Sequence, residues 1–138
     1  MKLLVAVDGS AHAAKAVAEA GKLAAALNAD VVVIHQRSDE PMDHATAAPS
    51  DEAASQAQSI VDSAVAALSA AGSATVTGRV IRGLSGDVPQ AIMDIAREES
   101  ADIIVVGPRG LGRLQGLLVG SVTDRLVQLA DRPVLVVR

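Results

Sequence analysis

The residues best suited to chemistry gather in one glycine-rich segment, from Gly107 to Ser121. Its fifteen positions hold five glycines, two arginines and no acidic residue. Glycines let backbone N–H groups approach an anion because no Cβ stands in the way, and arginines add positive charge. If Gly120 and Ser121 open a helix, its free N–H groups and its dipole favour negative charge at the same place. The segment therefore predicts an anion cradle; the alternative is a plain connection between a strand and a helix.

Two well-known phosphate-binding motifs do not fit this segment. It contains no G-x4-G-K-(S/T), so it lacks the lysine of a P-loop. A G-x-G-x-x-G motif that starts at Gly110 would need glycine or alanine at Gln115. The segment also follows the fourth apolar run of the chain and not the first, which disfavours a dinucleotide-binding Rossmann motif.

Five short runs of Val, Ile and Leu alternate with four alanine-rich stretches of helical periodicity. Four runs are almost continuously apolar, as in parallel strands covered on both faces, while the run 74–82 alternates as an edge strand does. Strands separated by helices pair in parallel through right-handed crossovers, so we expect an α/β fold, a single-domain helix/sheet/helix sandwich over residues 1–138. The expected strands are 2–8, 30–36, 74–82, 102–106 and 133–137, and the expected helices are 11–27, 51–71, 88–99 and 119–129.

Polar residues mark the expected ends of these helices. Ser10, Ser50, Asp87 and Ser121 are placed to cap the four N-termini. Gly72 lies where a helix favours a C-terminal glycine.

In open parallel sheets, ligands bind beyond the carboxyl ends of the strands, where the strand order reverses. Asp8 follows the first run and Gly107 follows the fourth, so both are candidate site residues. The Asp8 carboxylate suits a metal or a sugar hydroxyl, or else a turn beside Ser10. His12, His35 and His44 share no metal-ligand spacing, so no zinc site is expected. No combination of nucleophile and base indicates a catalytic residue.

Composition excludes several classes of protein. The chain has 138 residues, half of them hydrophobic, with no Cys, Phe, Tyr or Trp and a net charge of −4. Disulfide scaffolds, Cys-ligated zinc and aromatic stacking platforms are therefore excluded. The acidic balance argues against nucleic acid or an anionic membrane as a partner. The apolar run after Lys2 is too short for a signal peptide or a membrane span, so the expected location is the cytoplasm.

The spacing G-x2-G-x9-G-(S/T), met by Gly107, Gly110, Gly120 and Ser121, resembles the nucleotide-binding motif of the universal stress protein family (the A-type domain). The first strand up to Asp8-Gly9-Ser10, the second strand's end at His35 and the final strand agree with that family. The resemblance covers the whole chain. It implies a five-stranded parallel sheet of order 3-2-1-4-5, the adenine nucleotide alpha-hydrolase-like fold, with a switch point between the first and fourth strands.

Members of the family with this motif bind ATP, commonly with Mg²⁺ or Mn²⁺ held mainly through the phosphates and by few protein ligands, so the resemblance implies no residue of this chain as a metal ligand. Because this chain has no aromatic residue, adenine would lie between aliphatic side chains such as Val7, Ile34 and Val106. Pro108 departs from the usual motif by removing an N–H donor, which favours weaker binding or another ligand, AMP or cyclic AMP. Arg109 either clamps a phosphate or faces solvent. The site residues implied are Ala6, Val7 and Asp8 at the ribose or adenine end, Gln36 at the base edge, Val106 and Gly107 at the floor, and Arg109, Gly110, Gly120, Ser121 and Val122 at the phosphates.

The sequence thus predicts a small adenine-nucleotide sensor or regulatory binding module of the stress response. The alternatives are a slow ATPase or a nucleotidyl-transfer enzyme on the same scaffold, or a structural stress protein without nucleotide. The expected protein partner is a second copy, paired through the edge strand from Pro133 to Val137.

Overall fold

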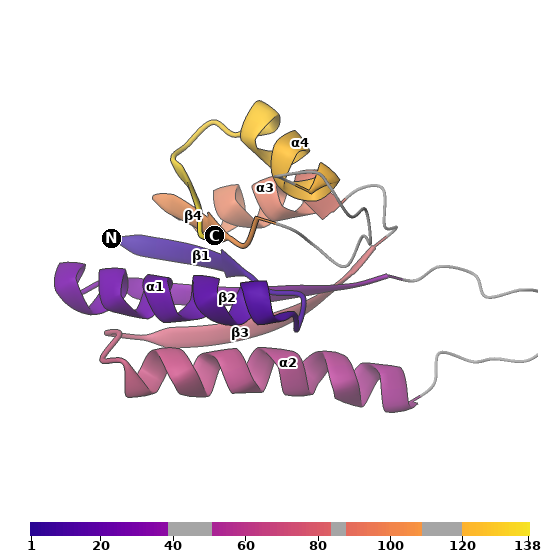
Figure 1. Ribbon diagram of the computed structural model, residues 1–138, viewed down its shortest axis with the longest axis horizontal. Helices are drawn as coiled ribbons and strands as arrows, with labels where there is room; N and C mark the ends of the chain where they lie inside the picture. The colour runs from indigo at the N-terminus through magenta and orange to yellow at the C-terminus, as the bar shows by residue number, and fades with distance from the viewer. Residues whose placement is uncertain (39–50, 84–87, 109–119) are drawn as a thin grey trace, which may run out of the picture.

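Strands and helices alternate along the whole chain (Figure 1). The computed structural model describes residues 1–38, 51–83, 88–108 and 120–138. The strands are β1 (Lys2–Ala6), β2 (Asp30–Ser38), β3 (Val76–Gly83), β4 (Ile103–Val106) and β5 (Val134–Val136), and the helices are α1 (Ala11–Leu27), α2 (Asp51–Ala70), α3 (Val88–Glu98) and α4 (Ser121–Leu129).

All five strands are parallel and follow the order β3-β2-β1-β4-β5, which confirms the predicted sheet. The central strand β1 pairs with β2 on one side and with β4 on the other, so that Ala6 lies opposite both Ile34 and Val106. The chain therefore reverses its winding direction between β1 and β4. The carboxyl ends of these two strands form the switch point at which a ligand is expected.

Helices cover both faces of the sheet (Figure 1). Successive strand residues point to opposite faces, so Leu3 and Val5 enter the core beneath α1 and α2 while Leu4 enters the core beneath α3 and α4. The largest fully buried side chains are Leu, Ile, Val and one Met, as a chain without aromatic residues requires. Among the described helices, none is long and apolar enough to span a membrane.

The helix ends agree with the sequence in part. Ser10 caps α1, because its Oγ accepts the amide of Ala13 at 3.2 Å. Gly72 follows α2 with a φ of +90°, which favours glycine. The prediction that Ser121 caps α4 is wrong: the cap is Gly120, in an extended conformation, and Ser121 is the first helical residue. The predicted caps Ser50 and Asp87 lie outside the described residues.

The strand bounds differ from the prediction by up to two residues, and two of the differences concern strand ends near the switch point. β1 stops at Ala6 because the chain then turns toward α1, two residues earlier than expected. β2 continues to Ser38, since it stays paired with the edge strand β3 as far as Gly83.

Candidate functional site

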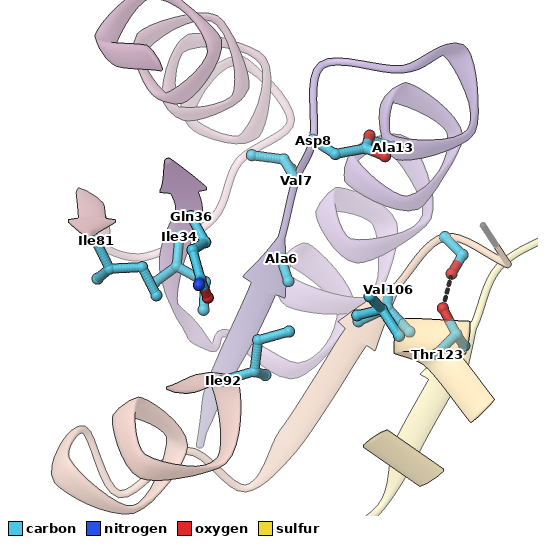
Figure 2. A pocket seen from close by; sticks show the side chains of 12 residues that line it. Ala6, Val7, Asp8, Ala13, Ile34, Gln36, Ile81, Ile92, Val106 and Thr123 are labelled. Atoms are coloured by element: carbon cyan, nitrogen blue, oxygen red, sulfur yellow. Dashed lines mark hydrogen bonds between the residues drawn. The ribbon is translucent and has the colours of Figure 1, made fainter. Parts of the chain in front are cut away.

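A cavity opens at the carboxyl ends of β1 and β4, at the switch point (Figure 2). Its volume is about 70 Å³, so it can hold one part of a ligand the size of a nucleotide and not the whole. Its walls come from all the strands except β5, and from α1, α3 and α4. The lining residues are Ala6, Val7, Asp8, Ala13, Ile34, Gln36, Ile81, Ile92, Val106, Gly107, Val122 and Thr123.

Asp8 is the one titratable residue among these lining residues. Its Oδ1 accepts the amide of Ser10 at 2.9 Å, closing the turn that leads into α1. Its Oδ2 is buried and has no hydrogen-bond partner among the described residues. A buried polar atom normally has a partner, because desolvation without one costs free energy. Oδ1 thus makes the turn beside Ser10, and Oδ2 is suited to accept a hydrogen bond from a ligand hydroxyl or to contact a cation.

The opposite walls are aliphatic. Ile34 and Gln36 project from the same face of β2, because they are two residues apart on a strand. Ile81 lies beside Gln36 in the register of β2 and β3, and Ile92 comes from α3 (Figure 2). A slot of this kind suits the flat apolar face of a ring, with the Gln36 side chain as a polar group at its edge.

Hydrogen bonds tie the two ends of the glycine-rich segment together. The Gly120 amide donates to the Pro108 carbonyl at 2.7 Å. The Thr123 hydroxyl, which is buried, donates to the Gly107 carbonyl at 3.0 Å (Figure 2). These bonds hold the N-terminus of α4 against the end of β4. By helix geometry the amides of Ser121, Val122 and Thr123 have no intrahelical acceptor, so this end of α4 favours an anion.

Gly107 allows a close approach between β4 and α1. A Cβ at this position would lie 3.3 Å from the backbone C and O atoms of His12, in the first turn of α1. This contact is tighter than most real Cβ contacts, so a larger residue would push the strand end and the helix apart. The glycine thus brings α1 and α4 to the same corner of the cavity.

The structure brings seven of the predicted site residues into one cavity, and Gly120 and Ser121 lie at the start of α4 beside it. Arg109 and Gly110 lie outside the described residues. Sequence reasoning missed Thr123, although a hydroxyl two residues after the motif's serine is a usable signal. It also missed Ala13, Ile81 and Ile92, whose places depend on strand register and helix orientation. The seven are Ala6, Val7, Asp8, Gln36, Val106, Gly107 and Val122.

A protein metal site is absent from the part of the chain that the structure describes. No group of three or more His, Asp or Glu side chains lies close enough there to hold a metal ion. A divalent cation at this cavity would meet one carboxylate, that of Asp8. Such a cation would need most of its ligands from a bound anion, as Mg²⁺ often does.

A larger cavity of about 340 Å³ lies between α1 and α2 on the other side of Val7 and Ala13. Small side chains and three serines form much of its lining, and no charged residue does. None of the buried described atoms without a hydrogen-bond partner belongs to it. The switch-point cavity, with Asp8 and the α4 N-terminus, is therefore the candidate site.

Comparisons with known proteins show the family and the fold of this chain. The model of the universal stress protein family matches residues 1–138. A universal stress protein of Thermus aquaticus is 35% identical over 141 residues, covering 99% of this chain and 97% of the relative. One of Mycobacterium tuberculosis is 34% identical over 137 residues, covering 99% of this chain, which spans only 44% of that relative's length. The crystal structure of a universal stress protein in complex with cAMP superposes with a TM-score of 0.78 at 28% identity, covering 100% of this chain and 96% of the other.

Proposed function

Because this chain belongs to the universal stress protein family, we propose that it binds an adenine nucleotide, ATP in the first place, as a sensor or regulatory module in the stress response. The observation that carries the proposal is the Asp8 carboxylate in the switch-point cavity. One oxygen is used by the turn to α1, while the other is buried and without a partner among the described residues. The related protein in complex with cAMP supports an adenine ligand.

The residues of the cavity fit the parts of such a ligand. The aliphatic slot formed by Ile34, Ile81 and Ile92 suits the adenine ring, which has no aromatic residue to stack on. Asp8 Oδ2 suits a ribose hydroxyl. The N-terminus of α4, at Ser121 and Val122, suits the phosphates. Mg²⁺ or Mn²⁺ would be held mainly by those phosphates, whose charge it would neutralise.

A binding role is favoured over an enzymatic one by the scarcity of titratable groups. Asp8 is the one such residue among the described residues that line the cavity, and its Oδ1 is engaged by Ser10. An enzyme that hydrolyses ATP or transfers a nucleotidyl group needs a base or a metal-binding pair of acids beside the phosphates. We therefore propose turnover that is slow or absent.

AMP or cyclic AMP is the second candidate ligand. Pro108 contributes no N–H at the start of the glycine-rich segment, and its carbonyl already accepts the Gly120 amide. Fewer donors for a triphosphate favour a ligand with a single phosphate. The cAMP complex of the related protein is the comparison that supports this candidate.

We also propose that the protein partner is a second copy of the chain, paired through the strand from Pro133 to Val137, and that the protein acts in the cytoplasm. The observed strand β5 is an edge of the sheet, and Leu135 on it is 39% exposed. An apolar edge strand favours pairing with another strand.

The test uses the optical transparency of a chain without Trp or Tyr. In the near ultraviolet, where peptide bonds are transparent, any absorbance of the purified protein should come from bound adenine, and mass spectrometry of the heat-released ligand should identify a nucleotide. Calorimetric titration with ATP and with cyclic AMP, each with Mg²⁺, should then rank the two ligands on the ligand-free protein. Asp8→Asn keeps an oxygen for the Ser10 amide but replaces the acceptor Oδ2 by an NH2 group, which cannot accept from a ribose hydroxyl, so it should raise Kd by about tenfold or more.

Asp102→Asn is the matched control. Asp102 accepts the backbone amide of Lys2 at 2.7 Å, at the opposite end of β1, and should leave Kd unchanged. Protein that carries no adenine and gives no heat with either nucleotide would refute the proposal. Steady-state turnover above about one per second, within the ordinary range of enzymes, would favour the enzymatic alternative.

A further inference from the structure

His35 is a buried histidine to which the nucleotide site gives no direct role. It lies on β2, between the cavity residues Ile34 and Gln36, and its side chain therefore points to the other face of the sheet. Only 7% of it is exposed. Its Nδ1 lies 2.8 Å from the backbone carbonyl oxygen of Val7. A carbonyl oxygen can only accept, so Nδ1 carries the hydrogen and donates it.

This hydrogen bond fixes the residue that immediately precedes Asp8. Val7 follows the end of β1, and its amide donates to the Ile34 carbonyl at 2.9 Å. Its carbonyl accepts from His35, so both backbone groups of Val7 are held by consecutive residues of β2. Because a peptide unit is planar, a fixed Val7 carbonyl also fixes the plane from which Asp8 departs.

The Asp8 side chain is held at its carboxylate by Ser10, the N-cap residue of α1. Ser10 donates its amide to Asp8 Oδ1 at 2.9 Å, which leaves Oδ2 as the buried oxygen without a partner among the described residues. The direction of the carboxylate thus depends on two hydrogen bonds, one to the Val7–Asp8 peptide and one to the side chain. His35 supplies the first of them from outside the cavity.

We propose that His35 is a positioning residue of the nucleotide site: through the Val7 carbonyl it sets the direction in which the Asp8 carboxylate enters the cavity. The proposal rests on the proposed function for its ligand, but its geometry concerns the protein alone. Both faces of β2 would then contribute to the site. Ile34 and Gln36 line the cavity on one face, and His35 on the other face holds the Val7 carbonyl.

Two substitutions of His35 separate the effect of losing the N–H donor from the effect of losing side-chain volume. In His35→Asn the amide nitrogen is as many bonds from Cα as Nδ1 is, so the donor is kept while volume is lost. In His35→Leu the volume is nearly kept while the donor is lost. Val33→Ala, on the same face of β2, removes buried volume without touching the Val7 carbonyl and serves as the control for destabilisation alone.

The measurements are Kd for ATP and cyclic AMP by calorimetry and the melting temperature of each variant. We expect His35→Leu to raise Kd about tenfold, while His35→Asn stays within about threefold of the parent although it melts lower than His35→Leu. Val33→Ala should lower the melting temperature and leave Kd unchanged. Equal Kd values in the Leu and Asn variants, or values that simply follow the melting temperature, would overturn the proposal.

Amide hydrogen exchange at Ser10 gives a readout without ligand. If His35 positions Asp8, the Ser10 amide should exchange about tenfold faster in His35→Leu than in His35→Asn, because its acceptor has moved. Should the parent protein bind neither nucleotide, the proposed function fails, and this exchange ratio still decides the positioning role. A ratio near one overturns it.

Discussion

At the scale of single residues, Thr123 shows how one hydroxyl can join a strand to a helix at a binding site. Its side chain is 3% exposed and donates to the carbonyl of Gly107, sixteen residues earlier in the chain. Both residues line the cavity. The bond holds the first turn of α4, where we place the phosphates, at a fixed distance from the end of β4.

Thr123→Val should therefore lower both stability and affinity. Valine keeps the shape of threonine but leaves the buried Gly107 carbonyl without this donor, at a cost of about 1–3 kcal/mol in the free energy of unfolding. Urea denaturation measures that loss, and ATP titration should show a higher Kd. Thr123→Ser keeps the hydroxyl and loses a methyl group, so it should lie closer to the parent in Kd. If Ser and Val raise Kd equally, the hydrogen bond is not what holds the site.

At the scale of elements, the packing of α2 on the edge strand β3 depends on Gly78. A Cβ there would overlap Val61 and lie 2.9 Å from Val65 Cγ2, both on α2. We expect Gly78→Ala to destabilise the fold by about 1–3 kcal/mol through overpacking, despite the better intrinsic propensity of alanine. The matched control is Thr77→Ala, an exposed neighbour on the same strand, with an expected change within about 0.5 kcal/mol in the same denaturation measurement. If Gly78→Ala is as stable as Thr77→Ala, α2 can shift away from β3 at little cost in free energy, and its packing does not depend on Gly78.

The elements themselves were largely predictable, because apolar runs and alanine-rich stretches alternate without ambiguity. α1 was predicted with its observed bounds, and the alternating run 74–82 was predicted to be an edge strand, which β3 is. The start of α4 was not predicted correctly. It depends on the hydrogen bond from the Gly120 amide to the Pro108 carbonyl, a tertiary contact that helix propensity does not reflect. Likewise, Ile81 reaches the cavity through its register beside Gln36, and neither strand's own sequence specifies that register.

At the scale of the whole molecule, the edge of the sheet at β5 presents an exposed apolar side chain. Leu135 on β5 lies opposite Val105 of β4, whose side chain enters the core on the α1 and α2 side. Val105 is fully buried, whereas Leu135, one strand further out, is 39% exposed. β5 therefore combines an unpaired edge with an exposed apolar side chain, the two features by which a second copy could extend the sheet.

The proposed dimer predicts that one charge at this edge separates the two copies. The parent protein should sediment at twice the 13.9 kDa of the chain at micromolar concentrations, while Leu135→Lys should sediment as a monomer, because pairing would bury the lysine charge. Leu27→Lys is the control: Leu27 is 43% exposed at the C-terminal end of α1, so an added lysine there should leave the dimer intact. A parent protein that sediments as a monomer, or equal dissociation of both variants, would contradict pairing through β5. Because β5 extends the sheet away from the switch point by way of β4, we further expect the Leu135→Lys monomer to bind ATP with the affinity of the dimer.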